Sequence, residues 1–138
     1  MGPAFAKAFG THAPLVLRPG YAISADGSTE RPAFFPLEKI DGPVLFLSAG
    51  DDQIWNSSAQ AKLGMAYLKS MHHPFADMWH DYPAAGHLFL FATPARPFVD
   101  APFVAGLTLE LGGTSAANVA AAADATTRIA TFLTQAFR

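Results

Sequence analysis

The chain has 138 residues, of which 51% are hydrophobic and only 14% are charged, and its formal net charge is −2. This length predicts at most one domain, and the small negative charge excludes the basic surface typical of nucleic-acid-binding proteins. The charged fraction is well below the roughly 25% of typical soluble domains. We therefore expect part of the surface to be covered, either by a missing part of the same fold or by a second copy.

Several targeting and chemical signals are absent from the sequence. No apolar run approaches the roughly 18 residues of a membrane span, and the N-terminus lacks the basic start and apolar core of a signal peptide. We therefore expect no membrane insertion, with the cytoplasm as the default compartment. The absence of cysteine excludes disulfides, thiolate metal sites and a cysteine nucleophile within the chain. We expect neither a cofactor nor a bound metal.

The first predicted strand separates two parts of the chain. Residues 1–36 are rich in glycine and proline, so we interpret them as a loop-rich N-terminal segment, and residues 37–138 as the main α/β segment. The run 44–47 is uniformly apolar and ends in a turn of small residues, which favours a strand buried on both faces, as in a parallel sheet. Two carboxylates, Asp51 and Asp52, follow this strand directly.

A helix and a second strand come next. The helix is predicted from Ser57 to about Met71, capped by Asn56 or Ser57, because apolar and small residues recur at spacings of three and four. Pro74 limits it, since the residue before a proline avoids helical geometry. Residues 76–82 suit a second strand. A strand, a helix and a strand with short connections predict a right-handed unit with parallel strands.

The remainder of the chain is predicted as a long irregular stretch followed by a helix. Residues 88–113 are rich in aromatics and proline, and 107–111 favour an edge strand or hairpin arm. The final helix is predicted from Ser115 to about Ala136 because of its many alanines. We expect its apolar stripe to face a core. The stripe consists of Val119, Ala122, Ile129, Phe132, Leu133 and Phe137.

Asp52 and His87 are the candidate catalytic residues, because functional groups of open α/β sheets lie just past the carboxyl ends of the strands. Asp52 occupies the last position of a small-x-x-Asp turn that starts at Ala49, where it can orient a histidine or, alternatively, cap a helix or turn. His87 follows the second strand and the small-residue loop 84–86, where it can act as a general base. We interpret Asp51 as solvated or structural.

Other residues have weaker claims to function. Trp55, Phe89 and Phe91 either line an acyl pocket or belong to the core, and Arg96 either contacts an anionic ligand or faces solvent. A metal site built from the remaining histidines fits no standard ligand spacing. The histidines weighed for it are His72, His73 and His80.

No serine of the chain stands in the G-x-S-x-G turn that exposes a nucleophile. The serines that fail this test are Ser24, Ser28, Ser48, Ser57 and Ser58.

Three sequence blocks together resemble one protein family. They are D-G-P-V-L-F-L-S-A-G-D-D-Q-I-W-N-S, Y-P-A-A-G-H-L and L-G-G-T-S-A-A-N-V-A-A-A-A-D-A-T-T-R-I-A-T-F-L. Over residues 36–138 the chain is similar to the C-terminal portion of the acyl-CoA thioesterase and bile acid-CoA:amino acid N-acyltransferase family, within the α/β-hydrolase superfamily. The last block is the most family-specific of the three.

The resemblance implies an α/β-hydrolase fold and acyl transfer from an acyl-CoA or another (thio)ester through a serine or cysteine nucleophile. The family's acid falls on Asp52 and its histidine on His87, whereas its nucleophile falls upstream of residue 1 and has no matching position. The family's N-terminal β-sandwich domain has no counterpart either. After His87 the sequence departs from the family pattern, so the resemblance assigns no acyl pocket.

The sequence therefore predicts the C-terminal part of an α/β-hydrolase fold, with parallel strands flanked by helices and the nucleophile-bearing half absent. We expect it to supply the acid and the histidine of an acyl-CoA thioesterase-like enzyme and to be inactive alone. Its expected partners are a (thio)ester substrate and either the missing N-terminal half or a second copy. Two alternatives stay open: an amino-acid N-acyltransferase or other α/β-hydrolase esterase or peptidase, and a non-catalytic binding or assembly module.

Overall fold

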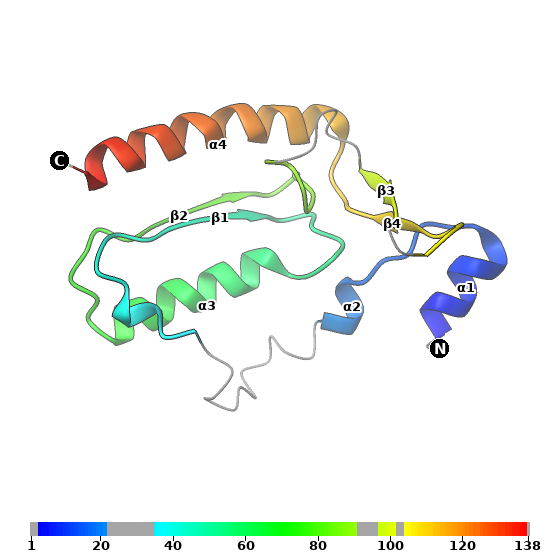
Figure 1. Ribbon diagram of the computed structural model, residues 1–138, viewed down its shortest axis with the longest axis horizontal. Coiled ribbons are helices and arrows are strands. Elements are labelled where there is room, and N and C mark those ends of the chain that lie inside the picture. The colour runs from blue at the N-terminus through cyan, green and yellow to red at the C-terminus, as the bar shows by residue number, and fades with distance from the viewer. Residues whose placement is uncertain (1–2, 22–34, 91–96, 102–103, 138) are drawn as a thin grey trace.

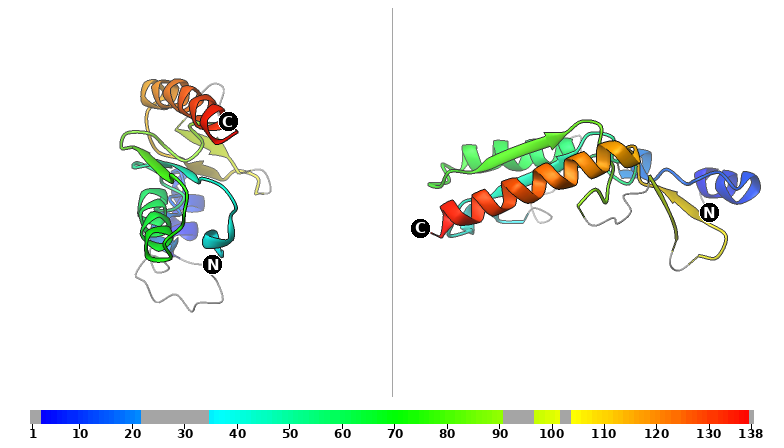
Figure 2. Two further views of the ribbon diagram at one scale, coloured as in Figure 1. Left: turned by 90° about the vertical axis from the view of Figure 1, so that its left-hand side faces the viewer. Right: turned by 90° about the horizontal axis from the view of Figure 1, so that it is seen from above.

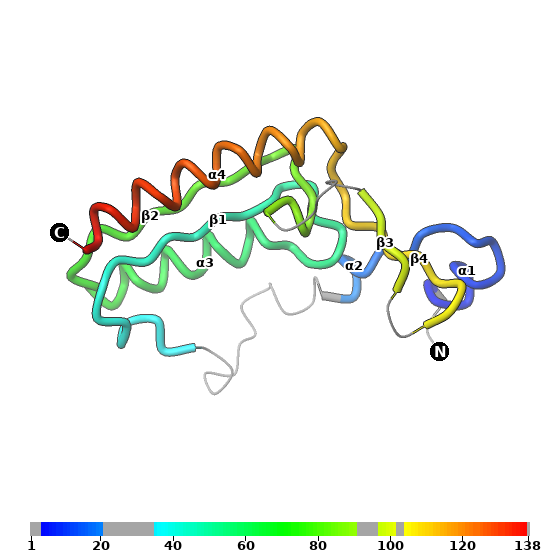
Figure 3. The backbone as a smooth tube through the Cα atoms, turned by 45° about the horizontal axis from the view of Figure 1, so that its top comes forward, coloured from blue at the N-terminus to red at the C-terminus, as the bar shows by residue number. Residues whose placement is uncertain are grey.

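A computed structural model describes residues 3–21, 35–90, 97–101 and 104–137. Two parallel strands, β1 and β2, lie between a helix on one face and a longer helix on the other, which gives three layers (Figures 1 and 2). A smaller group of short elements lies at the end of the molecule opposite the C-terminus (Figure 3). This arrangement confirms the mixed α/β class with parallel strands and flanking helices.

The central layer consists of β1, Leu45–Ala49, and β2, Met78–Tyr82. The strands are parallel, with Leu45 opposite Met78 and Ala49 opposite Tyr82. Both strands and their parallel pairing are as the sequence predicts. Because both strands run in the same direction, the turn after β1 and the loop after β2 leave the sheet at the same end.

Helix α3, Ser57–Ser70, connects the two strands and covers one face of them. The side chain of Asn56 caps the helix by accepting a hydrogen bond from the Ala59 amide at 3.2 Å. The helix approaches β1 closely at Gly64, where a Cβ atom would lie 2.8 Å from the ring of Phe46. The predicted helix and its cap are therefore confirmed. The absence of a side chain at Gly64 explains how α3 can pack so close to β1.

Helix α4, Ser115–Ala136, covers the opposite face of the strands (Figure 2). Its bounds match the sequence prediction, but the prediction that its apolar stripe faces a core is wrong for half of the stripe, whose other residues, Ala122, Ile129 and Phe132, are partly buried. Val119, Leu133 and Phe137 are 59%, 46% and 85% exposed. The buried residues are instead Asn118, Ala121 and Ala125.

The geometry of the layers explains this difference. A 22-residue helix is about 33 Å long, whereas a five-residue strand spans about 17 Å, so two strands cover only part of α4. Small residues in the first half of the helix allow a close approach to the sheet, and they form the main core with residues of the strand ends. This core consists of Ala49, Tyr82, Ala85, Phe89, Ala121 and Ala125.

The smaller group of elements contains a short antiparallel sheet and two helices. Strand β3, Phe98–Asp100, pairs with β4, Thr108–Glu110, which confirms the strand expected within residues 107–111. Helices α1, Pro3–Thr11, and α2, Arg18–Tyr21, lie nearby (Figure 1). A second core of Ala8, Leu15 and Leu107 joins α1 to the short sheet.

A 3₁₀ turn, η3, spans Leu37–Lys39 and precedes the segment leading into β1.

The division of the chain at residue 36 stays a prediction, since residues 22–34 lie outside the described part. None of the helices in the described ranges is long and apolar enough to cross a membrane.

His73 joins the segment before β1 to the segment before β2. Its Nδ1 lies 2.7 Å from Asp77 Oδ2 and its Nε2 lies 2.9 Å from the Ile40 carbonyl, while Asp77 Oδ1 accepts from the Val44 amide at 2.9 Å. A carbonyl and a carboxylate both accept, so both contacts are hydrogen bonds only when the ring is doubly protonated. The Ile40 carbonyl and then the Asp77 carboxylate raise the pKa of His73 above its ordinary value of 6.5.

The stability of the chain should therefore fall as pH rises through the raised pKa of His73. The folded state binds this proton more tightly than the unfolded state, so the stabilisation is fully present below pH 6.5 and is lost above the folded-state pKa. Thermal unfolding midpoints of wild type and His73→Gln, measured across this range, should differ most at low pH. His72→Asn is the control, because His72 is exposed and its φ of 54° suits asparagine. A difference between wild type and His73→Gln that does not change with pH would contradict this account.

Candidate active site

Asp52 is a buried acid in the turn that follows β1, with 1% of its surface exposed. Its Oδ1 accepts hydrogen bonds from the amides of Ile54 at 2.9 Å and Trp55 at 3.1 Å. Its Oδ2 faces the imidazole of His87. The two interpretations of this acid from sequence, a turn cap and a partner for histidine, therefore apply to different oxygens of one carboxylate.

His87 lies in the loop after β2, and its Nδ1 is 2.9 Å from Asp52 Oδ2. Its side chain is 19% exposed, whereas that of Asp52 is 2% exposed. The indole of Trp55 stands edge-on to the imidazole, with ring centroids 4.8 Å apart and an interplanar angle of 88°. The structure thus brings together the two residues singled out from sequence. It also places the indole of Trp55 against the imidazole of His87.

The hydrogen bond to Asp52 determines which nitrogen of His87 is available. An ionised carboxylate only accepts, so Nδ1 carries the proton in the neutral ring and Nε2 has a free lone pair. Within the described part of the chain, Nε2 has no hydrogen-bond partner. This is the arrangement of a general base whose second nitrogen is held by an acid.

A third segment, residues 111–113, ties the acid turn to the histidine loop. The Leu111 carbonyl accepts from the His87 amide at 2.8 Å and from the Gln53 amide at 3.4 Å. The Gly113 amide donates to Asp51 Oδ2 at 2.8 Å, which agrees with the structural interpretation of Asp51. The backbones of three separate segments therefore fix the positions of Asp52 and His87.

Glycines make this close approach of backbones possible. A Cβ atom on Gly86 would lie 2.6 Å from the Leu111 carbonyl oxygen, and one on Gly113 would lie 2.6 Å from the Gly86 amide nitrogen. Gly112 and Gly113 also have φ values of 81° and 71°, a left-handed conformation that other residues adopt at a cost. The G-G-T block of the sequence is thus a structural support of the site.

Arg18 is a residue of the site that sequence reasoning missed. Its Nη1 donates to the carbonyl oxygens of Gly50 at 3.1 Å and Asp52 at 3.2 Å. The amides of Leu17 and Arg18 also donate to the Gln53 carbonyl, at 3.0 and 2.9 Å. Arg18 precedes the acid turn by more than 30 residues and belongs to no recognisable motif, so no local signal identifies it.

A polar network holds α4 against β2 next to the site. The Tyr82 hydroxyl donates to Asp124 Oδ2 at 2.9 Å, and Arg128 Nε donates to the same oxygen at 2.5 Å. Burial and the Asp124 carboxylate raise the pKa of Tyr82 to about 12. The hydrogen bonds from Arg128 and then Tyr82 lower the pKa of Asp124. Tyr82 therefore stays protonated and Asp124 ionised near neutral pH, which keeps the contact between the two elements.

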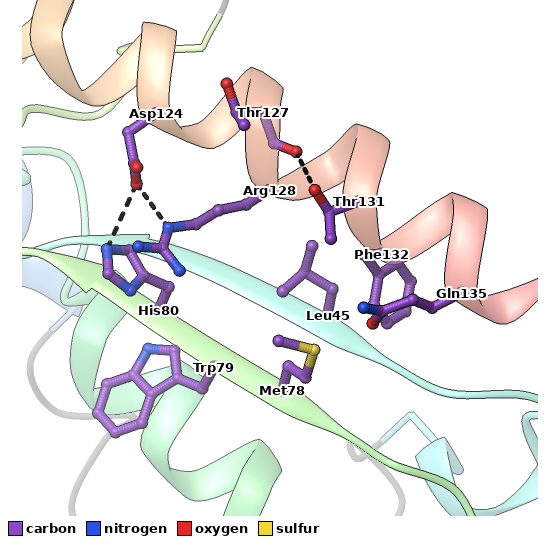
Figure 4. A pocket seen from close by; sticks show the side chains of 10 residues that line it. All are labelled: Leu45, Met78, Trp79, His80, Asp124, Thr127, Arg128, Thr131, Phe132 and Gln135. Carbon is purple, nitrogen blue, oxygen red and sulfur yellow. Dashed lines mark hydrogen bonds and ion pairs between the residues drawn. The ribbon is translucent and has the colours of Figure 1, made fainter.

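Two hollows lie along the groove between α4 and the strands. One has a volume of about 320 Å³ and is lined by Leu45, Met78 and Phe132 together with the Asp124–Arg128 pair (Figure 4). The other, of about 400 Å³, is more open and extends along the loop after β2.

Neither hollow is lined by Asp52 or His87. Both include His80, but its Nε2 is 3.7 Å from Asp124 Oδ2, which is too long for a hydrogen bond. We therefore place the candidate site at the Asp52–His87 pair, where the acid and the base are in direct contact.

The remaining candidates from sequence have varied positions. Phe89 belongs to the core, with its ring centroid 5.0 Å from that of Tyr82, while Phe91 and Arg96 lie outside the described residues. The described residues include no group of three or more potential metal ligands. Three of the serines outside a nucleophile turn donate hydrogen bonds through their hydroxyls, to the Ala49 carbonyl or to Asp81: Ser48, Ser57 and Ser58. Ser24 and Ser28 lie outside the described residues.

Comparison with known proteins adds family information. A family model described as "BAAT / Acyl-CoA thioester hydrolase C terminal" matches residues 12–138. The chain is 34% identical over 100 residues to mouse (Mus musculus) acyl-coenzyme A thioesterase 6, a match that covers 72% of this chain and 24% of that protein. It is 33% identical over 63 residues to mouse peroxisomal succinyl-coenzyme A thioesterase, covering 46% and 15%. The chain thus spans about a quarter or less of the length of these curated relatives.

Replacing Gly86 by alanine should separate the histidine loop from residues 111–113. The added Cβ meets backbone atoms of Leu111 and Gly112, which cannot rotate away, so we expect a loss of about 1–3 kcal/mol in the free energy of unfolding. Urea unfolding measures this loss. Gly42→Ala is the matched control, because nothing lies within 4 Å of its added Cβ. Equal stability of the two variants would show that the backbones do not approach as described.

Proposed function

Because the chain belongs to the family of BAAT and acyl-CoA thioester hydrolase C-terminal domains, we propose that it supplies the acid and the histidine of an acyl-CoA thioesterase-type hydrolase. The proposed catalytic residues are Asp52 and His87. The 2.9 Å contact between His87 Nδ1 and Asp52 Oδ2 carries the proposal, since it holds an imidazole with Nε2 available as a base.

The fold that this proposal implies is the C-terminal part of an α/β-hydrolase. In that fold the acid follows one strand and the histidine a later one, and the nucleophile precedes both along the chain. Asp52 follows β1 and His87 follows the adjacent parallel strand β2, which supports this assignment. The proposed nucleophile, serine or cysteine, comes from a segment outside these 138 residues.

The proposed reaction transfers an acyl group in two steps. The nucleophile gives its proton to Nε2 of His87 as it attacks the thioester carbonyl, and Asp52 stabilises the imidazolium through Nδ1–H. Collapse of the tetrahedral intermediate breaks the carbon–sulfur bond, and the imidazolium returns the proton to the departing thiolate. Water then gives a proton to Nε2 of His87 as it attacks the acyl-enzyme. The bond between the acyl carbon and the nucleophile breaks, the carboxylic acid leaves, and His87 returns the proton to the nucleophile.

The choice of acyl acceptor distinguishes this proposal from an N-acyltransferase. Both reactions share the acyl-enzyme, which water attacks in a hydrolase and an amine attacks in a transferase. Both mouse relatives are named as thioesterases, which favours water as the acyl acceptor. We therefore propose hydrolysis of an acyl-CoA or related (thio)ester as the reaction.

The surface of the chain supports a partner that completes the site. Met78 and Trp79 on β2 are 43% and 37% exposed, and Phe137 after α4 is 85% exposed. Such apolar surface is favourably covered by another part of a fold. We propose the nucleophile-bearing segment as that partner, in preference to a second copy, because a nucleophile has to reach Nε2 of His87.

The isolated chain should show no triad-dependent hydrolysis. A short acyl-CoA and a p-nitrophenyl ester are incubated with the 138-residue chain and with His87→Ala, and the two rates should be equal, because His87 has no nucleophile to activate. Activity of the wild-type chain that His87→Ala abolishes would reveal a nucleophile within these residues and would overturn the proposal of an external one.

Grafting the chain into a relative should restore hydrolysis. The segment of mouse acyl-coenzyme A thioesterase 6 that matches this chain is replaced by the chain, and acyl-CoA hydrolysis is measured. In an active graft, His87→Ala should lower kcat by on the order of 10⁴-fold or more and Asp52→Asn by about 10⁴-fold. His72→Asn, on an exposed histidine, is the control and should leave kcat unchanged. An active graft insensitive to His87→Ala would exclude His87 as the base.

A further inference from the structure

Asn118 is a buried polar side chain on a helix otherwise rich in alanine, with 2% of its surface exposed. Its Oδ1 accepts a hydrogen bond from the Gly86 amide at 2.8 Å, and its Nδ2 lies 3.5 Å from the Gly112 carbonyl oxygen. Both partners are backbone groups of the loops that surround the candidate site. The side chain thus connects α4 to two segments at once.

The contact with Gly86 acts directly on the loop that carries His87. The Gly86 amide is held by Asn118, and the next amide, that of His87, is held by the Leu111 carbonyl at 2.8 Å. Two consecutive amides fixed in this way define the direction in which the His87 side chain leaves the backbone. Without Asn118, the buried Gly86 amide loses its acceptor and this part of the loop loses its anchor.

The contact with Gly112 extends the same connection toward the acid. Gly112 is followed by Gly113, whose amide donates to Asp51 Oδ2 at 2.8 Å, and Asp51 precedes Asp52 in the chain. The oxygen of Asn118 also occupies the space that a side chain on Gly113 would need. Asn118 therefore lies at the centre of a bridge between the histidine loop and the acid turn.

Helix formation does not account for an asparagine at this position. The N-cap of α4 is Thr114, whose hydroxyl oxygen accepts from the Ala117 amide at 3.1 Å. Asparagine is a weaker helix former than alanine, so Asn118→Ala favours the helix itself. The reason for the residue therefore lies in the contacts that it makes outside the helix.

We propose that Asn118 is a positioning residue that sets the His87 imidazole against Asp52 by holding the Gly86 amide and the Gly112 carbonyl. This inference rests on the proposed function of the Asp52–His87 pair. Asn118 touches neither of these two side chains directly, and its effect passes through the backbone of the two loops.

The test is ¹⁵N NMR of the histidine side chains in the 138-residue chain, which needs no turnover. In wild type, neutral His87 should carry its proton on Nδ1, the nitrogen that faces Asp52. In Asn118→Ala, we expect the Nδ1–H form to be lost in favour of Nε2–H, while circular dichroism shows the helices retained. Thr114→Ala removes a contact of the same helix that does not involve the histidine loop, and it should leave the His87 tautomer unchanged.

A conservative variant keeps the test decisive if Asn118→Ala does not fold. Asn118→Asp keeps an oxygen for the Gly86 amide, the shorter of the two contacts, but has no donor for the Gly112 carbonyl, so a folded chain should keep part of the Nδ1–H form of His87. A folded Asn118→Asp chain in which this form is lost completely would overturn the proposal. Retention of the Nδ1–H form in folded Asn118→Ala, or its equal loss in Thr114→Ala, would do the same.

In the grafted thioesterase, Asn118→Ala should lower kcat by about 10- to 100-fold with little change in KM, because a misplaced base slows the chemistry and not substrate binding. Equal loss in kcat and in substrate binding would indicate a general structural defect and would count against the proposal. If the graft shows no hydrolysis although the tautomer responds as expected, the proposed function fails while the positioning role holds. The positioning role of Asn118 and the proposed hydrolase function are therefore tested separately.

Discussion

The parallel register of β1 and β2 determines where the two proposed catalytic residues, Asp52 and His87, lie. Ala49 pairs with Tyr82, so the turn after β1 and the loop after β2 leave the sheet side by side. Asp52 and His87 are 35 residues apart in sequence, yet this register brings Asp52 Oδ2 to 2.9 Å from His87 Nδ1. A slip of one residue would reverse the face on which every side chain of the slipped strand lies and would separate the pair.

A buried carboxylate needs compensating contacts, and the turn provides them. Asp52 accepts two backbone amides through Oδ1 and the imidazole through Oδ2, so both of its oxygens are satisfied despite 1% exposure. Around it, glycines let three backbone segments approach one another. Arg18 of α2 contacts the acid turn, and Asn118 of α4 contacts the histidine loop. The site therefore depends on main-chain geometry more than on the packing of large side chains. This explains why the family-specific block contains a pair of glycines with positive φ.

The sequence predicted the local elements and singled out Asp52 and His87, which the structure places in contact. It was wrong where contacts between distant parts of the chain decide. Strand, helix, strand and final helix are each determined by short-range periodicity and caps, and Asp52 and His87 follow from their places after the strands. The prediction that the apolar stripe of α4 faces a core failed for Val119 and Phe137, which stay exposed. Periodicity shows that a helix has an apolar face, but it does not show how much sheet is available to cover that face. Arg18 was missed because its contacts with Gly50 and Asp52 span 32 and 34 residues and it belongs to no motif. Asn118 lies in the family-specific block, but its contact with Gly86 spans 32 residues and no local pattern indicates it.

The proposed function depends most directly on the hydrogen bond between Asp52 and His87. The measurement that tests it is ¹⁵N NMR of the His87 side chain in the 138-residue chain at neutral pH, compared with Asp52→Asn. That variant keeps an oxygen for the Ile54 and Trp55 amides but removes the carboxylate. We predict that wild-type His87 carries its proton on Nδ1, protected from exchange with water, and that Asp52→Asn abolishes this state. A wild-type ring protonated on Nε2, with the same spectrum in Asp52→Asn, would contradict the assignment of these residues as an acid–base pair.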